Sequence, residues 1–289
     1  MQWQGRAVHT SLGVQPRGSG QRILAAMANE LVDPWPFMLQ FIQAGINPAL
    51  LEAYCRPGPL PDLPDEAFLK EALDALSLLQ KVLKNGFESL TMERKIALID
   101  LILTQGTKEF SSLLKGTDSH DEDTLIQALE RKLGPWGERE KRAVQALSTN
   151  QLVFADTALN EARTGKLKLQ FGSRGIEVRY LHRLLYVVQR YLEMPQLKQD
   201  PFDFFNNNTS TAISAFQQKV SQEIPDRSDP CAPDLYMLRL LEYVVLVKQP
   251  SKKHQKRGMQ IIEEKDHKFK VTFKHFNAFV DFYCKVVQA

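Results

Sequence analysis

Apolar residues recur at spacings of three and four positions along most of this chain, and this pattern constrains the fold more than any other feature. A helix brings residues three and four apart onto one face, so the pattern predicts amphipathic helices that bury one side. The longest stripe consists of Phe68, Leu69, Leu73, Leu76, Leu79 and Leu83. Before residue 165 no segment alternates apolar and polar residues over the length of a strand. We therefore predict a mainly α fold, with a helical domain over residues 21–164.

Short motifs predict where these helices begin and end. Asn47, Asp65 and Thr91 each precede an apolar stripe, and their side chains are good acceptors for the free N–H groups of a first turn. Gly106 follows a stripe, where a left-handed residue ends a helix at low cost. The sharpest interruption is residues 56–64, where four prolines in nine residues exclude a helix interior and predict an extended linker or a rigid loop.

The two ends of the helical domain are predicted from weaker signals. Residues 1–20 combine glycine and proline with polar residues, which predicts a flexible arm. At the other end of the domain, the spacing of apolar residues predicts one continuous helix over residues 150–163.

No targeting segment or membrane span is predicted. The first basic residue, Arg6, is not followed by the apolar run of a secretory signal. The longest apolar run, Leu235–Val247, is too short to cross a bilayer and is interrupted by Arg239 and Glu242. We expect a protein that is cytoplasmic, or that reaches the cell envelope by a leaderless route.

The formal net charge of +3 conceals a local excess of positive charge near the C-terminus. Residues 251–275 hold eight basic and three acidic residues, and the run Ser251–Gly258 would suit the phosphates of nucleic acid or anionic lipid. No phenylalanine, tyrosine or tryptophan occurs within Ser251–Gly258, so we interpret this run as a solvated loop and do not expect a nucleic-acid partner.

The sequence predicts neither a metal site nor a cofactor. Cys55, Cys231 and Cys284 are widely spaced, which favours reduced, mostly buried thiols over zinc ligands or a disulfide framework. The densest group of possible metal ligands, Thr117–Asp123, lacks the central glycine of an EF-hand loop. We interpret it as a solvated loop whose acidic residues complement the N-terminal dipole of the next helix.

Residues 251–289 have a different pattern from the rest of the chain. Apolar and charged residues alternate over 259–264 and 268–276, which predicts a short β-hairpin with its turn at 263–267. An apolar face over residues 277–287 predicts a closing helix.

Two segments in the second half of the chain share spacings with a known family. The first is a glycine-punctuated turn leading into a helix, and the second is an asparagine-rich start followed by a helix. The matching residues are Gly172, Gly175, Val178, Leu181, Leu185, Phe205, Thr209, Ala212, Ile213, Phe216 and Gln217. The order of the segments and the uninterrupted Thr-x-x-Ala-Ile-x-x-Phe-Gln spacing resemble the peptidoglycan-binding domain family, a small three-helix module found beside many cell-wall hydrolases.

The chain departs from this family at identifiable places. His182 stands where glutamine is usual, and Asp203 and Asn206 stand where paired glycines are usual. Asparagine and aspartate tolerate the left-handed conformation that such a turn requires, so the turn itself can be kept. Residues 186–200 are a long insertion relative to the family pattern.

The resemblance implies a peptidoglycan-binding-like domain over residues 165–250, which would anchor the protein or its assembly to a bacterial cell wall. The wall's glycan and stem peptides would bind without catalysis in a shallow groove beside the glycine turn and the asparagine-rich turn. Arg174, Arg179, Asn207 and Asn208 would supply hydrogen-bond donors to carboxylates and amides in this groove. The matching residues themselves would occupy core and turn positions.

Two other functions stay open from the sequence. One is an interaction or scaffold protein of a secretion or phage-like assembly, which keeps the fold and binds a protein. The other is a wall hydrolase with its active site in the helical N-terminal domain, since Glu88-Ser89 resembles the Glu-Ser pair of lytic transglycosylases. We interpret Glu88 as a surface residue in a helix–helix turn, and no nucleophile-elbow or metalloprotease motif occurs. We therefore favour a non-enzymatic protein.

Overall fold

A computed structural model describes most of the chain beyond its N-terminal arm. The described residues are 33–113, 127, 129, 137–197, 202–221, 235–247, 262–265 and 268–271. The predicted arm over 1–20, the metal-ligand cluster at 117–123, the basic run at 251–258 and the closing helix at 277–287 lie outside the described residues.

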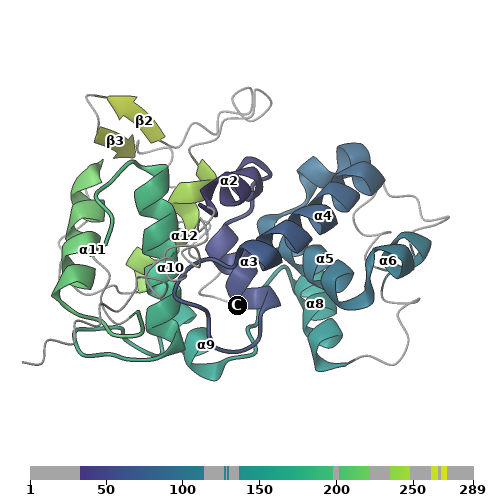
Figure 1. Ribbon diagram of the computed structural model, residues 1–289, viewed down its shortest axis with the longest axis horizontal. Helices are drawn as coiled ribbons and strands as arrows, with labels where there is room; N and C mark the ends of the chain where they lie inside the picture. The colour runs from purple at the N-terminus through teal and green to yellow at the C-terminus, as the bar shows by residue number, and fades with distance from the viewer. Residues whose placement is uncertain are drawn as a thin grey trace, which may run out of the picture. The chain divides into compact units, whose positions relative to one another are not determined.

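The described part of the chain is mostly helical, which confirms the prediction of a mainly α protein (Figure 1). The helices are α2 (Trp35–Gln43), α3 (Pro48–Cys55), α4 (Glu66–Leu83), the 3₁₀ helix η1 (Lys84–Ser89), α5 (Met92–Gln105), α6 (Thr107–Leu113), α8 (Glu138–Thr149), α9 (Thr157–Arg163), α10 (Ile176–Tyr191), α11 (Asn207–Lys219) and α12 (Leu235–Val247). Helix α5 packs against α4 and α8, and α10 packs against α9 and α12.

The predicted helix starts are confirmed by hydrogen bonds of the capping side chains. Asn47 Oδ1 accepts from the Ala49 N–H at 3.0 Å, and Asp65 Oδ1 accepts from the Ala67 N–H at 2.9 Å. Gly106 has a φ of +88° and ends α5, which only a residue without a Cβ does at low cost. The proline-rich segment 56–64 is non-helical, as predicted, and links α3 to α4. These boundaries are local, because each depends on bonds that span only a few residues.

The predicted continuous helix over residues 150–163 is wrong. Asn150 takes the left-handed conformation, with a φ of 58°, and ends α8 instead of beginning a new helix. Asp156 then starts α9, since its side chain accepts a hydrogen bond of 2.9 Å from the Leu159 N–H. Phe154 lies in the segment between these two helices, and the side chain of Asn160 on α9 holds it by bonding both its N–H and its C=O. The hydrogen bonds that the Asp156 and Asn160 side chains make to the backbone therefore interrupt the helix that the apolar spacing alone predicted.

We expect Asp156→Ala to lower the free energy of unfolding by about 1 kcal/mol, because the Leu159 N–H loses its partner. Asp156→Asn is the matched control, since asparagine caps helices equally well and should leave stability nearly unchanged. Urea titration of the two variants beside the wild type measures the difference. Equal loss in both variants would show that the carboxylate charge, and not the cap, is what matters.

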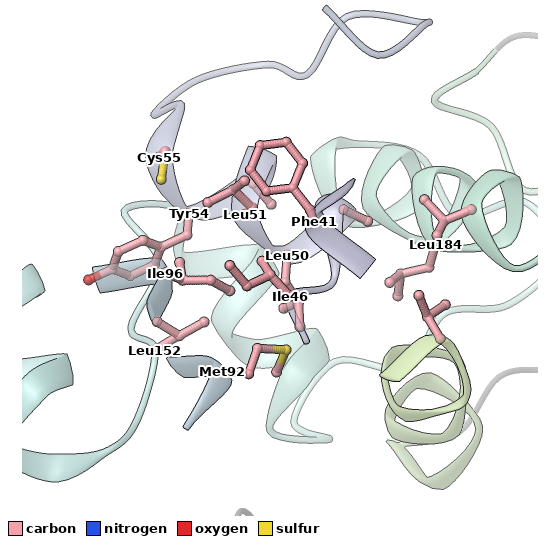
Figure 2. Packing of buried hydrophobic residues seen from close by; sticks show 14 of the residues in the cluster. Phe41, Ile46, Leu50, Leu51, Tyr54, Cys55, Met92, Ile96, Leu152 and Leu184 are labelled. Atoms are coloured by element: carbon pink, nitrogen blue, oxygen red, sulfur yellow. The ribbon is translucent and has the colours of Figure 1, made fainter. Parts of the chain in front are cut away.

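One buried core joins helices from both halves of the described chain. Figure 2 shows Phe41, Leu50 and Ile96 packed in one cluster with Leu184, which lies on α10. Residues from Pro34 onward accordingly form a single compact unit. The predicted division at residue 164 stays a prediction about sequence modules, and it does not coincide with a break in this core.

A buried ionic cluster explains the charges within the apolar helix α12. Arg163 Nε lies 2.9 Å from Glu242 Oε1, and Arg239 Nη1 lies 2.7 Å from Oε2. The Tyr180 hydroxyl donates to Glu242 Oε1 at 2.8 Å, and Asn47 Nδ2 donates to the Glu242 carbonyl at 3.0 Å. Burial alone would raise the pKa of Glu242, but the two guanidinium charges outweigh it and lower that pKa to about 2.

Among the described helices none combines the length and apolarity that a bilayer crossing requires.

Three short strands complete the described elements. They are β1 (Val220–Ser221), β2 (Ile262–Lys265) and β3 (Lys268–Val271), in the order β1-β3-β2. β3 pairs with β1 in parallel and with β2 antiparallel, in a register that sets Ile262 opposite Val271. Residues 263 and 264, which were predicted both in the first strand and in the turn, lie in β2, and so does Lys265, which was predicted in the turn alone. The hairpin over its predicted length stays a prediction, because residues on both sides of the strands lie outside the described ranges.

Candidate functional site

The predicted glycine turn is held against the segment that precedes α11. The Gly172 N–H donates to the Phe205 carbonyl, and the Phe205 N–H donates to the Ser173 carbonyl, both at 2.9 Å. The Gly175 N–H donates to the Asp203 carbonyl at 3.1 Å. Gly175 has a φ of +133°, and a Cβ there would lie 2.6 Å from a carboxylate oxygen of Glu177. Because that oxygen ends a flexible side chain that can move away, it is the positive φ that favours glycine at this position.

The asparagine-rich turn begins α11 through the side chain of Asn206. Its Oδ1 accepts from the Asn208 N–H at 2.9 Å and from the Thr209 N–H at 3.1 Å. The helix starts at Asn207, so Asn207, Asn208 and Thr209 form its first turn. Asn206, which stands where the family has a glycine, thus serves as the cap.

His182 ties α10 to the turn that begins α11. Its Nδ1 lies 2.6 Å from the Phe202 carbonyl oxygen, and its Nε2 lies 2.8 Å from Thr209 Oγ1. A carbonyl can only accept, so Nδ1 carries a hydrogen and donates it to Phe202. The ring is nearly buried and stacks edge to face on Phe202. His182 therefore fixes the position of the segment that leads into α11.

A cavity of about 350 Å³ lies beside this turn. Its walls come from the proline-rich loop, from α10, from the segment after α10 and from the start of α11. The lining residues are Asp62, Leu63, His182, Tyr186, Gln189, Gln196, Leu197, Phe202, Asn206, Asn208 and Thr209. Six of the eleven carry an amide or a hydroxyl group, but Gln189, Asn206 and Thr209 already bond protein groups. The lining therefore offers a few polar contacts beside apolar ones.

Two arginines on α10 hold the proline-rich loop in place as the outer wall of the cavity. Arg183 Nη2 donates to the Pro61 carbonyl at 2.7 Å, and its Nη1 donates to the Asp62 carbonyl at 3.4 Å. Arg179 Nη1 donates to the Leu60 carbonyl at 2.6 Å. Arg183 is fully buried, and its Nε lies 2.8 Å from Oε2 of the equally buried Glu52. The charge of Arg183 is thus balanced by Glu52 away from the cavity.

The four predicted ligand-binding residues lie in different surroundings. Asn208 lines the cavity, whereas the neighbouring Asn207 is exposed and does not line it. Arg179 bonds the proline-rich loop. Arg174 is exposed, and its Cζ lies 4.3 Å from the centroid of the Phe204 ring. The structure therefore brings one of the four to the cavity, and ligand binding by the other three stays a prediction.

The residues matching the family pattern lie mainly in the core. Seven of them are buried: Val178, Leu181, Leu185, Phe205, Ala212, Ile213 and Phe216. Thr209 is buried as well and bonds His182, whereas Gln217 is half-buried.

Sequence reasoning missed most of the cavity. His182, Tyr186 and Gln189 follow a helical spacing of four and three, so a polar stripe on an otherwise apolar helix could have pointed to them. Gln196 and Leu197 belong to the insertion at 186–200, which was noted only as a departure from the family. Nothing in the sequence indicates that the proline-rich loop lies beside these residues of α10 and of the insertion.

The described residues offer no alternative site of metal chemistry. No group of three or more His, Cys, Asp or Glu side chains within the described ranges could hold a metal ion. Cys55 is a buried, free thiol whose pKa burial raises well above its ordinary value. Glu88 is exposed within η1, which confirms its prediction as a surface residue.

Comparison with protein-family models, with curated proteins and with solved structures found no match to this chain.

Proposed function

We propose that this protein binds bacterial peptidoglycan without catalysis, and that the cavity beside the asparagine-rich turn is the binding site. One observation carries the proposal: the cavity is at the start of α11, and His182, Asn208 and Thr209 of its lining belong to the part of the chain that resembles the peptidoglycan-binding module. The protein would thereby anchor itself, or an assembly that it belongs to, to the cell wall.

The lining of the cavity supports this ligand class. Peptidoglycan consists of N-acetylated sugars and short peptides, and both present amide and hydroxyl groups in quantity. Gln196 and Asn208 offer side-chain amides, and Leu63 and Leu197 offer apolar contact. The Oε1 of the buried Gln189 accepts from the Leu197 N–H at 3.1 Å, which leaves only its amide N–H groups for a ligand. A volume of about 350 Å³ is at the lower end for ligand sites, so it suits one or two residues of a stem peptide.

The same lining supports binding over hydrolysis. A glycosidase of the usual kind needs two carboxyl groups that flank the scissile bond, and Asp62 is the one carboxylate among the lining residues. His182 is the one imidazole there, and both of its ring nitrogens bond protein groups. A general acid or base needs a free position within reach of its substrate.

Co-sedimentation with purified sacculi tests the proposal. We expect the full chain to sediment with sacculi, and Asn208→Leu to weaken the apparent affinity about ten-fold through the loss of a ligand hydrogen bond. Asn207→Leu is a matched control, because the adjacent residue is exposed and does not line the cavity. Wild-type protein that stays in the supernatant would overturn the proposal. Equal loss in the two variants would place binding elsewhere.

One observation favours the alternative of an interaction protein that keeps this fold and binds a protein partner. Phe171 is 61% exposed at the glycine turn and packs edge to face against Phe204, over which Arg174 lies. Exposed aromatic residues beside arginine are typical of protein interfaces. A stoichiometric protein that co-purifies with the wild type and is lost with Phe171→Ser, while sacculus binding is absent, would favour this alternative.

A further inference from the structure

We propose that the cavity selects ligands that carry a protonated amine, which the carboxylate of Asp62 binds. This inference rests on the proposed function and specifies its ligand. The ligand would be a stem peptide that has not been cross-linked, since such a peptide keeps the free side-chain amine of its diamino acid. Cross-linking converts that amine into an uncharged amide.

The charge of the lining points to an ammonium group. Asp62 is the one carboxylate among the eleven lining residues, and no lysine or arginine is among them. No ion pair to Asp62 is found among the described residues. Asp62 is exposed at the edge of this site, so it attracts a cation and disfavours an anion while solvent still screens part of its charge.

The two arginines of α10 that bond the proline-rich loop do not alter this balance within the lining. Arg179 and Arg183 bond backbone carbonyls of Leu60 and Pro61, and neither lines the cavity. The guanidinium of Arg183 is buried against Glu52, with 2.8 Å between Nε and Oε2. The cavity therefore suits the amine of a stem peptide better than its carboxylates.

The backbone of Asp62 is held in a fixed position beside the cavity. Its own carbonyl and the two carbonyls before it accept hydrogen bonds from Arg183 and Arg179, so the backbone at this point of the loop is fixed to α10. Leu63 follows directly, is 43% exposed and also lines the cavity. A carboxylate beside an apolar side chain matches an amine at the end of an alkyl chain, because the chain contacts the leucine while the ammonium reaches the carboxylate.

A double-mutant cycle tests the inference by isothermal titration of the full chain. The two probes are a soluble disaccharide–peptide with a free side-chain amine and the same compound with that amine acetylated. We expect the wild type to bind the free-amine probe about ten-fold more tightly than the acetylated one. Asp62→Asn should bind both probes with equal affinity, close to that of the wild type for the acetylated probe. Asp74→Asn removes the same charge from an exposed site on α4 that does not line the cavity, and should keep the ten-fold preference.

The outcomes separate this inference from the function on which it rests. If the wild type binds both probes equally, or if Asp62→Asn keeps the preference, the amine selectivity is overturned while peptidoglycan binding stands. If neither probe binds and sacculi are not bound either, the proposed function itself is overturned and the selectivity with it.

Discussion

Glu242→Ala is expected to lower the free energy of unfolding by about 3 to 5 kcal/mol. The substitution leaves the guanidinium groups of Arg163 and Arg239 buried without a counter-charge, and the Tyr180 hydroxyl loses its acceptor. The side chain of Glu242 is 1% exposed, so water cannot replace these partners without local unfolding. Urea unfolding followed by circular dichroism measures the loss.

Lys141→Ala is the matched control for a salt bridge at the surface. Lys141 pairs with Glu138 at 2.7 Å, but both side chains are mostly exposed. Exposed ion pairs of this kind contribute little, so we expect no measurable change in the midpoint of unfolding. A similar loss in both variants would contradict the assignment of the buried cluster as the larger contributor.

The contribution of Glu242 should also depend on pH in a defined direction. Its pKa falls from an ordinary value of 4.5 to about 2 on folding, so its stabilising effect is complete above pH 4.5 and is lost as the pH falls toward 2. A shift of this size corresponds to about 3 kcal/mol. The difference in stability between the wild type and Glu242→Gln should therefore be largest near pH 7 and shrink below pH 4.5. Burial raises the pKa of Glu52 and Asp100, but both proteins share these groups and the difference largely cancels them. Burial also raises the pKa of Glu93, which interacts with Glu242 and both arginines, so a part of the measured pH dependence comes from Glu93.

Arg183→Ala should have the second large effect, again a loss of about 3 to 5 kcal/mol. It removes the partner of the buried Glu52 and two hydrogen bonds that hold the proline-rich loop. The exposed Arg174 supplies a control, since Arg174→Ala should change stability by about 0.5 kcal/mol or less.

The double variant Glu52→Gln/Arg183→Met shows which part of that loss comes from the stranded charge. Because the double variant leaves no unpaired charge, we expect it to be more stable than Arg183→Ala. The loop should stay loosened in both, so binding at the cavity should be weak in both. A double variant no more stable than Arg183→Ala would assign the loss to the loop contacts instead.

The helices themselves were largely predictable from the sequence, and the cavity was not. Asn47, Asp65 and Gly106 mark boundaries through bonds to residues a few positions away, which a reader of the sequence can recognise. The error at residues 150–163 arose where two signals competed. Apolar spacing favoured a helix, and the backbone hydrogen bonds of Asn160 and Asp156 favoured an interruption.

For the candidate site, the sequence indicated the asparagine-rich turn, and Asn208 does line the cavity. It also nominated Arg179, whose guanidinium the fold uses to hold the proline-rich loop. An arginine in a turn region has the same appearance in sequence whether it binds a ligand or a backbone carbonyl. Only the position of the carbonyl distinguishes the two roles.

The sequence by itself determined a mainly helical chain, the boundaries of most described helices and a fixed glycine turn before α10, because these depend on interactions over one or two helical turns. Tertiary structure alone decided that the proline-rich loop would become a wall of the cavity. The bond from Arg183 to Pro61 joins residues that are 122 positions apart, and no local pattern records a contact of that range. The same holds for Asp62, since its proximity to α10 arises from the packing of the whole core.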